Sequence, residues 1–299
     1  MTLMSKNYKK ILFILLLTTF FFQRQVVLAE RISVSVDQTI FAFSANPDST
    51  NEIKLNVKNI SEKSQKMSIV TKDFVAGDNG SIISMTNKNE QFGMSEWVLA
   101  KEPDWILEPQ SNKEISLSVN IPKNATVGAH YAIANIQTFP TVDGQNFQNT
   151  IVGGQVGVYI LVNVNGDVSG SGNLKKLKAP IVVGNSASLR ADFENTGNVM
   201  YIPHGEIQIE NIFTRKKTAF EAEKHFVFPG TKYSFEIKWN EPSIFGAYSA
   251  QANFVDANGI NHNQQRFFLG NFFLIIPFLF LGFVFLVRAK IRKIKNRNL

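Results

Sequence analysis

Apolar and polar residues alternate with a period of two along most of the chain between residues 30 and 266. The clearest runs are residues 32–36, 53–57, 115–121 and 207–209. Such alternation is typical of a β-strand that buries one face. Turn-forming pairs such as Pro229-Gly230 and Asn258-Gly259 separate the runs, and no long stretch repeats with the helical period. We predict an all-β fold built from sandwiches.

Three landmarks recur in the same order in the two halves of this region. Each half has a strand that ends in an Asn turn, then a strand that starts after a proline, then a Gly-aromatic entry into a further strand. The landmarks are Asn59, Pro109 and residues 128–131 in the first half, and Asn195, Pro229 and residues 246–248 in the second. This repeat predicts two immunoglobulin-like β-sandwiches, residues 30–168 and 173–266. The glycine-rich boundary at residues 165–171 predicts few contacts between them.

Both ends of the chain carry apolar segments next to basic residues. Lys6, Lys9 and Lys10 precede an apolar run at residues 11–22, and small residues near Ala29 suit a signal-peptidase cut, so residues 1–29 are predicted to be a signal peptide. Residues 267–287 contain no charge and are predicted to form a transmembrane helix. The basic tail at residues 288–299 is then expected in the cytoplasm. The expected location is the cell membrane, with a single pass and an extracytoplasmic N-terminal part.

The net charge of +7 is misleading when the chain is taken as a whole. Of the 31 basic residues, four lie in residues 1–29 and six follow Val287, which leaves 21 basic residues against all 24 acidic ones. The predicted exported part is therefore mildly acidic, at −3. This excludes nucleic acid as an expected partner.

The chain has no cysteine. A disulfide framework, a thiolate metal site and a cysteine nucleophile are therefore excluded. An exported domain of this size without disulfides favours a bacterial surface protein, and the single anchor favours a Gram-positive one.

The remaining residues show no pattern of an enzyme or a cofactor site. The four histidines are scattered, and His130 is expected to be a half-exposed strand residue. Asp256 begins a stretch that resembles a calcium loop, but a hairpin turn explains it better. The glycines at positions 153, 154 and 157 favour a tightly packed strand start over a phosphate loop. We predict no enzyme activity, no metal and no cofactor.

Two Trp-x-Leu tripeptides lie eight residues apart, beginning at Trp97 and Trp105. Buried aromatic residues that hold an irregular segment over the core are the favoured interpretation. A ligand-facing aromatic shelf is the alternative, and it makes Trp97 and Trp105 the candidate binding residues.

The order of export signal, two sandwiches, one span and a basic tail resembles the WxL-interacting surface proteins of low-GC Gram-positive bacteria. The residues that carry the resemblance are Val57-Lys58-Asn59, the stretch from Ile106 to Pro109, Ile121-Pro122, and the anchor from residue 267 onward. The resemblance implies a first domain that binds peptidoglycan and a second that binds host or partner proteins.

Three function classes follow. The leading hypothesis is a membrane-anchored binding or scaffold protein that engages cell-wall peptidoglycan or surface proteins through loops and strand edges. The second is a chaperone-like assembly factor for exported subunits. The third, more remote, is a cell-wall hydrolase whose carboxylates meet only in the fold.

Overall fold

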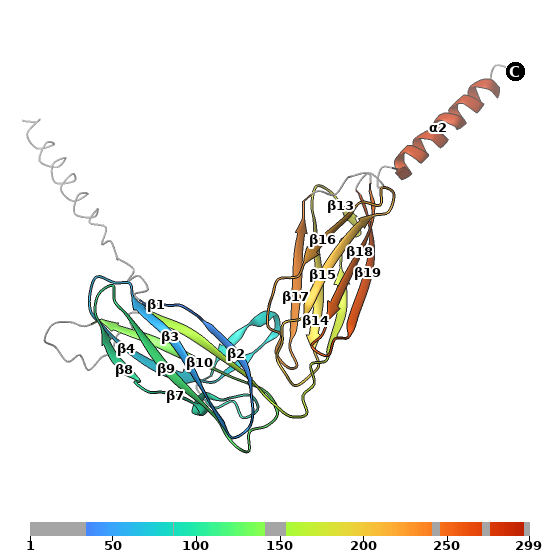
Figure 1. The fold of residues 1–299 in the computed structure, drawn as a ribbon. Helices are drawn as coiled ribbons and strands as arrows, with labels where there is room; N and C mark the ends of the chain where they lie inside the picture. The colour runs from blue at the N-terminus through green and yellow to red at the C-terminus, as the bar shows by residue number, and fades with distance from the viewer. Residues whose placement is uncertain (1–33, 86, 141–153, 241–245, 271–275, 296–299) are drawn as a thin grey trace, which may run out of the picture.

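A computed structural model describes residues 34–85, 87–140, 154–240, 246–270 and 276–295 (Figure 1). The predicted signal peptide, residues 1–29, lies outside the described residues. Nearly all the described elements are β-strands, and one α-helix lies near the C-terminus. The prediction of a mostly β fold is confirmed.

The first domain is a sandwich of two sheets. One sheet has the order β1-β3-β9-β7, and the other has the order β2-β11-β10-β4-β8. The bounds are β1 Val34–Val36, β2 Ile40–Ala45, β3 Ser49–Asn59, β4 Gln65–Lys72, β7 Val98–Ala100, β8 Asp104–Leu107, β9 Asn112–Ile121, β10 Gly128–Pro140 and β11 Gly154–Val164. The inward residues of both sheets, among them Leu55, Leu117 and Ile136, form one buried apolar core.

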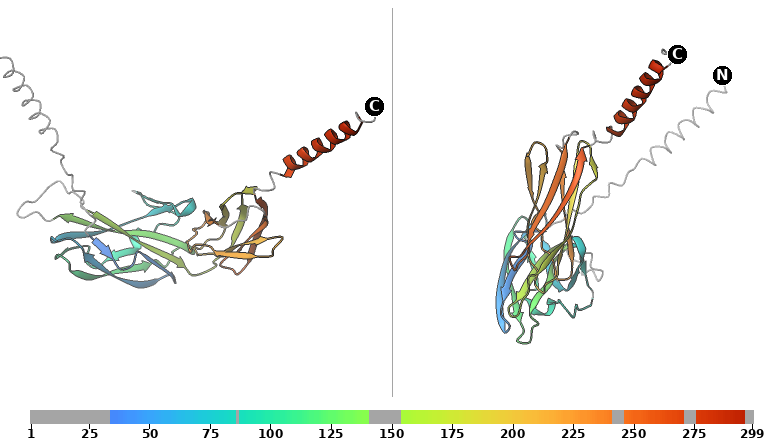
Figure 2. Two further views of the ribbon diagram at one scale, coloured as in Figure 1. Left: turned by 90° about the horizontal axis from the view of Figure 1, so that it is seen from above. Right: turned by 90° about the vertical axis from the view of Figure 1, so that its right-hand side faces the viewer.

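The second domain is also a sandwich, with the sheet orders β12-β14-β17 and β13-β19-β18-β15-β16. The bounds are β12 Gly172–Lys178, β13 Val182–Val183, β14 Ala187–Asn195, β15 His204–Asn211, β16 Lys217–Glu221, β17 Lys232–Trp239, β18 Ala247–Val255 and β19 Asn261–Gly270. Phe193, Phe235 and Phe254 lie at the centre of its core. The two sandwiches follow one another along the molecule and meet at an angle (Figures 1 and 2).

The two domains have the same topology. In each domain the first strand, β1 or β12, lies at the edge of one sheet. The next strand, β2 or β13, belongs to the other sheet and pairs in parallel with β11 or β19. The strand that ends in the repeated asparagine pairs with the strand that follows the repeated proline, as β3 with β9 and β14 with β17. The sequence repeat therefore corresponds to a repeat of the fold.

The repeated asparagines make the same bonds in both domains. The side chain of Asn59 donates to the carbonyls of Lys63 and Leu107, and that of Asn195 donates to the carbonyls of Val199 and Val227. In each domain the second carbonyl belongs to the residue two places before the repeated proline. Both asparagines are fully buried, so each side chain satisfies backbone groups that water does not reach.

An insertion in the first domain reaches the second domain. Between β4 and β8 the chain forms β5 (Phe74–Ala76), the 3₁₀ turn η1 (Asp78–Gly80), β6 (Ile82–Ser84), the 3₁₀ turn η2 (Ser95–Trp97) and β7. Asp78 and Asn79 in η1 accept hydrogen bonds from the backbone of β17, with N···O distances of 2.8 and 3.0 Å at Lys232 and Ser234. The β5–η1–β6 arm thus lies against the second domain (Figure 1).

A third apolar cluster fills the elbow between the domains. Phe74, Tyr131 and Leu161 of the first domain pack with Met200 and Phe228 of the second, and all five are buried. The expectation of few contacts across the junction is therefore wrong. It considered only the connecting glycines, whereas the contacts come from β10, β11 and an insertion about 90 residues earlier in the chain.

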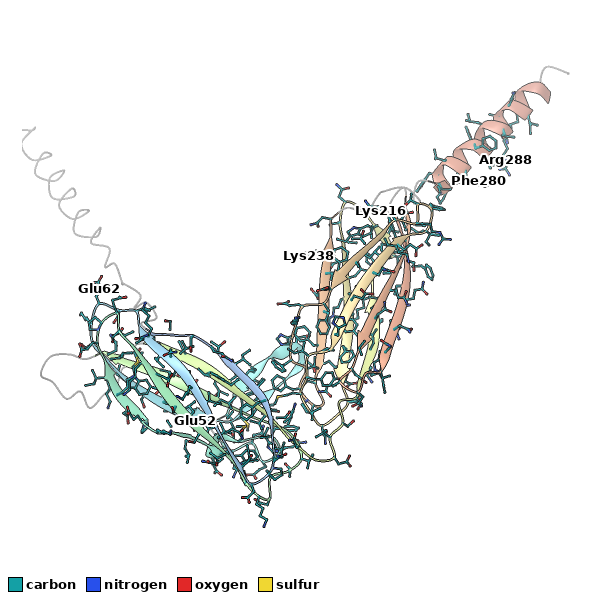
Figure 3. The ribbon with its side chains drawn as sticks, viewed as in Figure 1. Glu52, Glu62, Lys216, Lys238, Phe280 and Arg288 are labelled. Atoms are coloured by element: carbon teal, nitrogen blue, oxygen red, sulfur yellow. The ribbon has the colours of Figure 1, made fainter. Side chains whose placement is uncertain are left out.

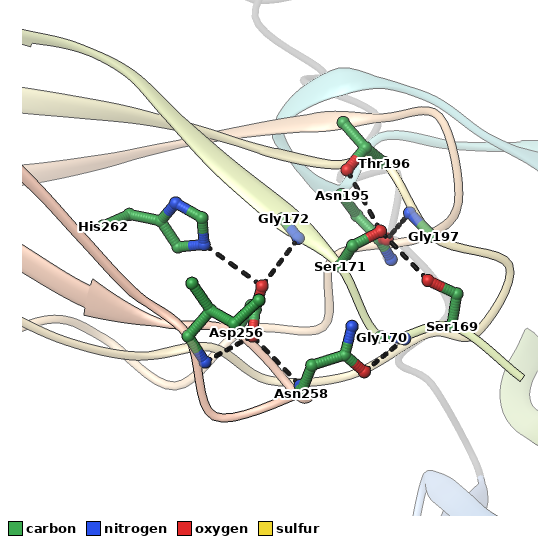
Figure 4. Close-up of polar contacts among 11 residues, drawn as sticks. Ser169, Gly170, Ser171, Gly172, Asn195, Thr196, Gly197, Asp256, Asn258 and His262 are labelled. Atoms are coloured by element: carbon green, nitrogen blue, oxygen red, sulfur yellow. Dashed lines mark hydrogen bonds and ion pairs between the residues drawn. The ribbon is translucent and has the colours of Figure 1, made fainter.

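The glycine-rich connection itself is held by hydrogen bonds (Figure 4). The Gly170 amide donates to the Asn258 side chain at 3.0 Å, and the Gly172 amide donates to the Asp256 carboxylate at 3.1 Å. A Cβ at Gly197 would lie 2.0 Å from the Ser169 carbonyl oxygen. These glycines allow backbone segments to approach closely rather than to swing freely.

The start of the predicted membrane span is wrong. Residues 267–270 belong to β19, where Phe268 faces the core and its neighbours Phe267 and Leu269 face outward. Helix α2, Ile276–Lys295, follows and contains residues 276–287 of the apolar run, whereas residues 271–275 lie outside the described residues. Among the described residues, no helix has the length and apolar content needed to span a membrane.

Candidate functional site

The outer face of the first domain's five-stranded sheet carries a row of polar side chains. In β10 and β11 the inward positions are apolar, such as Ile136 and Ile160, and pack in the core. The alternate positions point to the other face, where Asn135 pairs with Gly157 and Gln137 pairs with Gln155. We refer to Asn135, Gln137, Gln155, Gly157 and Tyr159, with the outward residues of β4, as the open face.

Three amides on the open face bond to one another. Gln155 Nε2 donates to Asn135 Oδ1 at 2.7 Å, and Gln137 Nε2 donates to Gln155 Oε1 at 3.2 Å. Asn135 is buried beneath the other two, whereas Gln155 is exposed. Because each amide both donates and accepts, the outer pair retains hydrogen-bonding capacity for a ligand.

The side chain of Ile133 packs closely over Gly157 on the open face. A Cβ there would lie 2.7 Å from Ile133 Cδ1 and 3.7 Å from Asn135 Oδ1. The missing side chain therefore makes room for Ile133, which packs against the strand at this point. This close packing agrees with the structural interpretation of the glycines, and Gly154 is the first residue of β11.

Strand β4 continues the open face with residues of different chemistry. Ser68 pairs with Gln137 and Val70 pairs with Asn135, and Lys66 and Lys72 lie on either side of them. Asp104 of the edge strand β8 pairs with Ser68. Hydroxyl, amide, ammonium and carboxylate groups therefore surround one exposed valine, which suits a polar ligand.

The second domain closes one end of the open face. Ile133 and Leu161 lie on the same face as the amides but are buried in the elbow cluster. Asn163, two residues after Leu161, exchanges two hydrogen bonds with the Met200 backbone, at 2.9 and 3.1 Å. The elbow thus fixes the position of the second domain at this end.

The two candidate tryptophans do not lie on the open face. Trp105 is 7% exposed and points from β8 into the core. Trp97 is half-buried in η2, and its ring centroid lies 4.6 Å from that of His130. The burial of Trp105 agrees with the interpretation of this residue as core, and the structure does not bring the two rings onto one shelf.

His130 is buried, not half-exposed as expected. Its position on β10 faces inward, and its Nε2 lies 2.8 Å from the Thr126 carbonyl. Burial lowers the pKa of His130, while the hydrogen bond to Thr126 opposes this shift. The buried, neutral imidazole of His130 therefore packs against the ring of Trp97.

The stretch that begins at Asp256 is a hairpin turn, as predicted. It joins β18 to β19, and Asp256 accepts backbone hydrogen bonds from Asn258 and Ile260. Within the residues that the structure describes, no group of three or more His, Asp or Glu side chains could hold a metal.

The three bonded amides of the open face, Asn135, Gln137 and Gln155, were not predicted from the sequence, because their proximity depends on strand register. Asn135 and Gln137 interrupt an otherwise apolar strand, which is a visible clue. Gln155 lies 18 residues beyond Gln137, and only the pairing of β10 with β11 brings the two together.

One family model matches most of the first domain. Residues 29–137 match the model described as WxL Interacting Protein, peptidoglycan binding domain. No curated protein matches the chain significantly.

The whole chain resembles several solved structures at low identity. It matches the E. coli chaperone DraB at 13% identity and a TM-score of 0.37, covering 79% of this chain and 97% of that one. It matches the class 5 fimbriae chaperone CfaA at 11% identity and a TM-score of 0.41, covering 79% and 99%. The Salmonella enterica SafA pilin in complex with the SafB chaperone matches at 13% identity and a TM-score of 0.36, covering 79% and 96%. At these values the likeness carries no information about function.

Proposed function

We propose that the first domain, whose sequence is of the WxL-interacting type over residues 29–137, binds cell-wall peptidoglycan through its open face. The family match is the observation that carries the proposal. The match covers most of the first domain's strands, from β1 to most of β10.

The chemistry of the open face supports this ligand. Peptidoglycan presents hydroxyl and acetamido groups on its sugars and carboxylates on its peptides. Gln137 and Gln155 offer amide donors and acceptors, and Lys66 and Lys72 offer positive charge to the carboxylates.

Co-sedimentation of the full chain with purified, protein-free peptidoglycan tests the proposal. The native chain is expected to pellet with the wall material. The double variant Gln137→Ala, Gln155→Ala should bind about tenfold more weakly, because each lost hydrogen bond contributes about 0.5–1.5 kcal/mol. Both side chains lie outside the core, so circular dichroism should be unchanged.

A matched double variant provides the control. Gln251→Ala, Gln265→Ala removes two amides from paired positions on the corresponding sheet of the second domain. This variant should pellet like the native chain. Equal weakening by both double variants, or no binding by the native chain, would contradict the proposal.

We further propose that the region after β19 anchors the protein in a membrane. The charge-free run 271–287 has 17 residues, close to the lower limit of about 17–25 for a spanning helix. Six basic residues and no acidic residue follow it, which favours a cytoplasmic tail. Protease added to intact, wall-stripped cells should digest both sandwiches and spare an epitope on the tail. Digestion of that epitope from outside would contradict the topology.

A further inference from the structure

Large apolar side chains are exposed at the end of the second domain that leads to α2. They are Ile181 at 82% exposure, Phe213 at 67%, Phe267 at 67% and Leu269 at 38%. We refer to these four residues as the apolar rim. They come from three separate segments, namely the entry to β13, the turn between β15 and β16, and the end of β19.

Backbone pairing joins these segments into one surface. The Leu269 amide donates to the Ile181 carbonyl at 2.9 Å, and Leu269 also pairs with Ala247 of β18. The Ile212 amide donates to the Ala247 carbonyl at 2.8 Å, which places the β15–β16 turn beside the same strand end. Phe267 lies two residues before Leu269, so both point to the same face of β19.

The β15–β16 turn also carries positive charge. Arg215, Lys216 and Lys217 begin two residues after Phe213. Glu210 is the one acidic residue in the stretch 210–217, and its carboxylate lies 3.1 Å from Arg215 and 3.9 Å from Lys217. This leaves a net charge of +2 beside the apolar rim.

Helix α2 begins just beyond the apolar rim. β19 ends at Gly270, and α2 begins at Ile276 with exposed Phe278 and Phe280. Figure 3 shows Lys216 at the end of the second domain that lies towards Phe280. Strand β19, which carries two of the four rim residues, and helix α2 are thus successive elements, and α2 lies beyond this end of the second domain (Figure 1).

We infer that the apolar rim rests on an anionic lipid surface, with Phe213 and Phe267 in the headgroup region and Lys216 close to the lipid phosphates. Aromatic rings suit this depth because it is partly apolar and partly wet. Lysines next to them gain attraction from anionic lipids. The inference rests on the proposed membrane anchor and adds to it a defined contact that orients the second domain on the bilayer.

Fluorescence quenching by brominated lipids tests the contact. The full chain is reconstituted into phosphatidylglycerol vesicles with and without bromine on the acyl chains. In Phe267→Trp, the fluorescence added by the new indole should be quenched by about half or more, because an interfacial ring reaches the upper acyl chain. Leu99→Trp, at an apolar position on β7 of the first domain that is 56% exposed, should not be quenched.

Protein charge and lipid charge provide a second test with the same fluorescence signal. Adding Lys216→Glu to Phe267→Trp should reduce the quenching, and so should replacing phosphatidylglycerol with phosphatidylcholine. An unchanged signal in both cases would overturn the role given to the basic turn. Native-like circular dichroism of each variant confirms that the fold is retained.

Vesicle flotation separates failure of the contact from failure of the anchor. If the chain floats with the vesicles but Phe267→Trp is not quenched, the anchor stands and the lipid contact of the rim is overturned. If the chain does not float, the anchor fails and the inference fails with it. Absent quenching together with a dimer that Phe267→Ser dissociates would instead identify the rim as a contact between two copies.

Discussion

One buried polar residue, Asn195, contributes to the stability of the second domain through its hydrogen bonds. Its side chain donates to the Val199 and Val227 carbonyls in two buried hydrogen bonds and accepts one from the Gly197 amide. In Asn195→Ala both carbonyls lose this donor, and each buried unsatisfied group costs about 1–3 kcal/mol. We expect the free energy of unfolding of the second domain to fall by about 3 kcal/mol in urea titrations. Asn173→Ala, at an exposed site on β12, should change it by about 0.5 kcal/mol or less.

Trp105 and Ile106 are adjacent on β8 but have opposite environments. Trp105 is buried in the first domain's core, whereas Ile106 is 64% exposed. Trp105→Ala should lower the free energy of unfolding by about 3–5 kcal/mol, and Ile106→Ala by about 0.5 kcal/mol or less. Thermal melts of the two variants measure the difference. A folded, stable Trp105→Ala protein that no longer binds wall material would instead assign Trp105 to the binding site.

At the scale of the element, β14 is held to both neighbouring strands by one carboxylate. Asp192 lies 2.8 Å from Lys178 Nζ of β12 and accepts a hydrogen bond from Ser234 of β17 at 2.8 Å. Burial acts to raise the pKa of Asp192, but the contacts with Lys178, Arg190 and Ser234 outweigh it and lower the pKa to about 2.

This shift predicts an acid-dependent loss of stability. The folded pKa of Asp192 lies below its ordinary value of 3.8, so the unfolded chain binds the proton more readily. The stabilisation is complete above about pH 5 and is lost as the pH falls towards 2. Between pH 5 and 2, the melting temperature of Asp192→Asn should fall less steeply than that of the native chain. Parallel curves for the two proteins would show that this carboxylate contributes nothing to acid stability.

Alternation along the chain was a reliable guide to single elements. Residues 53–57, 115–121 and 207–209 all lie in strands. Alternate side chains of a half-buried strand face the core and the solvent, so apolar and polar residues alternate in its sequence. The same rule explains the error at residues 267–270. There Phe267, Phe268 and Leu269 alternate in burial without alternating in polarity, so the end of β19 could not be distinguished from the start of a helix. The open face was not predictable, because it arises from pairing between strands.

At the scale of the whole molecule, the elbow cluster determines whether the domains unfold together. Phe228 of the second domain lies edge-on to Phe74 and Tyr131 of the first, with ring centroids 6.0 and 5.1 Å away. Phe228→Ala removes the aromatic ring that joins the two cores. We expect calorimetry to resolve two transitions in this variant and a single transition in the native chain.

An exposed apolar site in the second domain serves as the control for this coupling. Ile260→Ala, in the β18–β19 turn at 54% exposure, should leave the single transition unchanged. Two transitions in the native chain would show that the elbow does not couple the domains, despite its buried area.

Peptidoglycan binding at the open face is the central claim, and side-chain NMR tests it most directly. Soluble peptidoglycan fragments are titrated into the isotopically labelled chain while the side-chain amide signals of Gln137 and Gln155 are followed. Both signals should shift in a saturable manner. Gln208, Gln251 and Gln265, which pair across the corresponding sheet of the second domain, should not shift. Saturable shifts confined to the second domain's amides, or no shift at any amide at saturating fragment, would contradict the account.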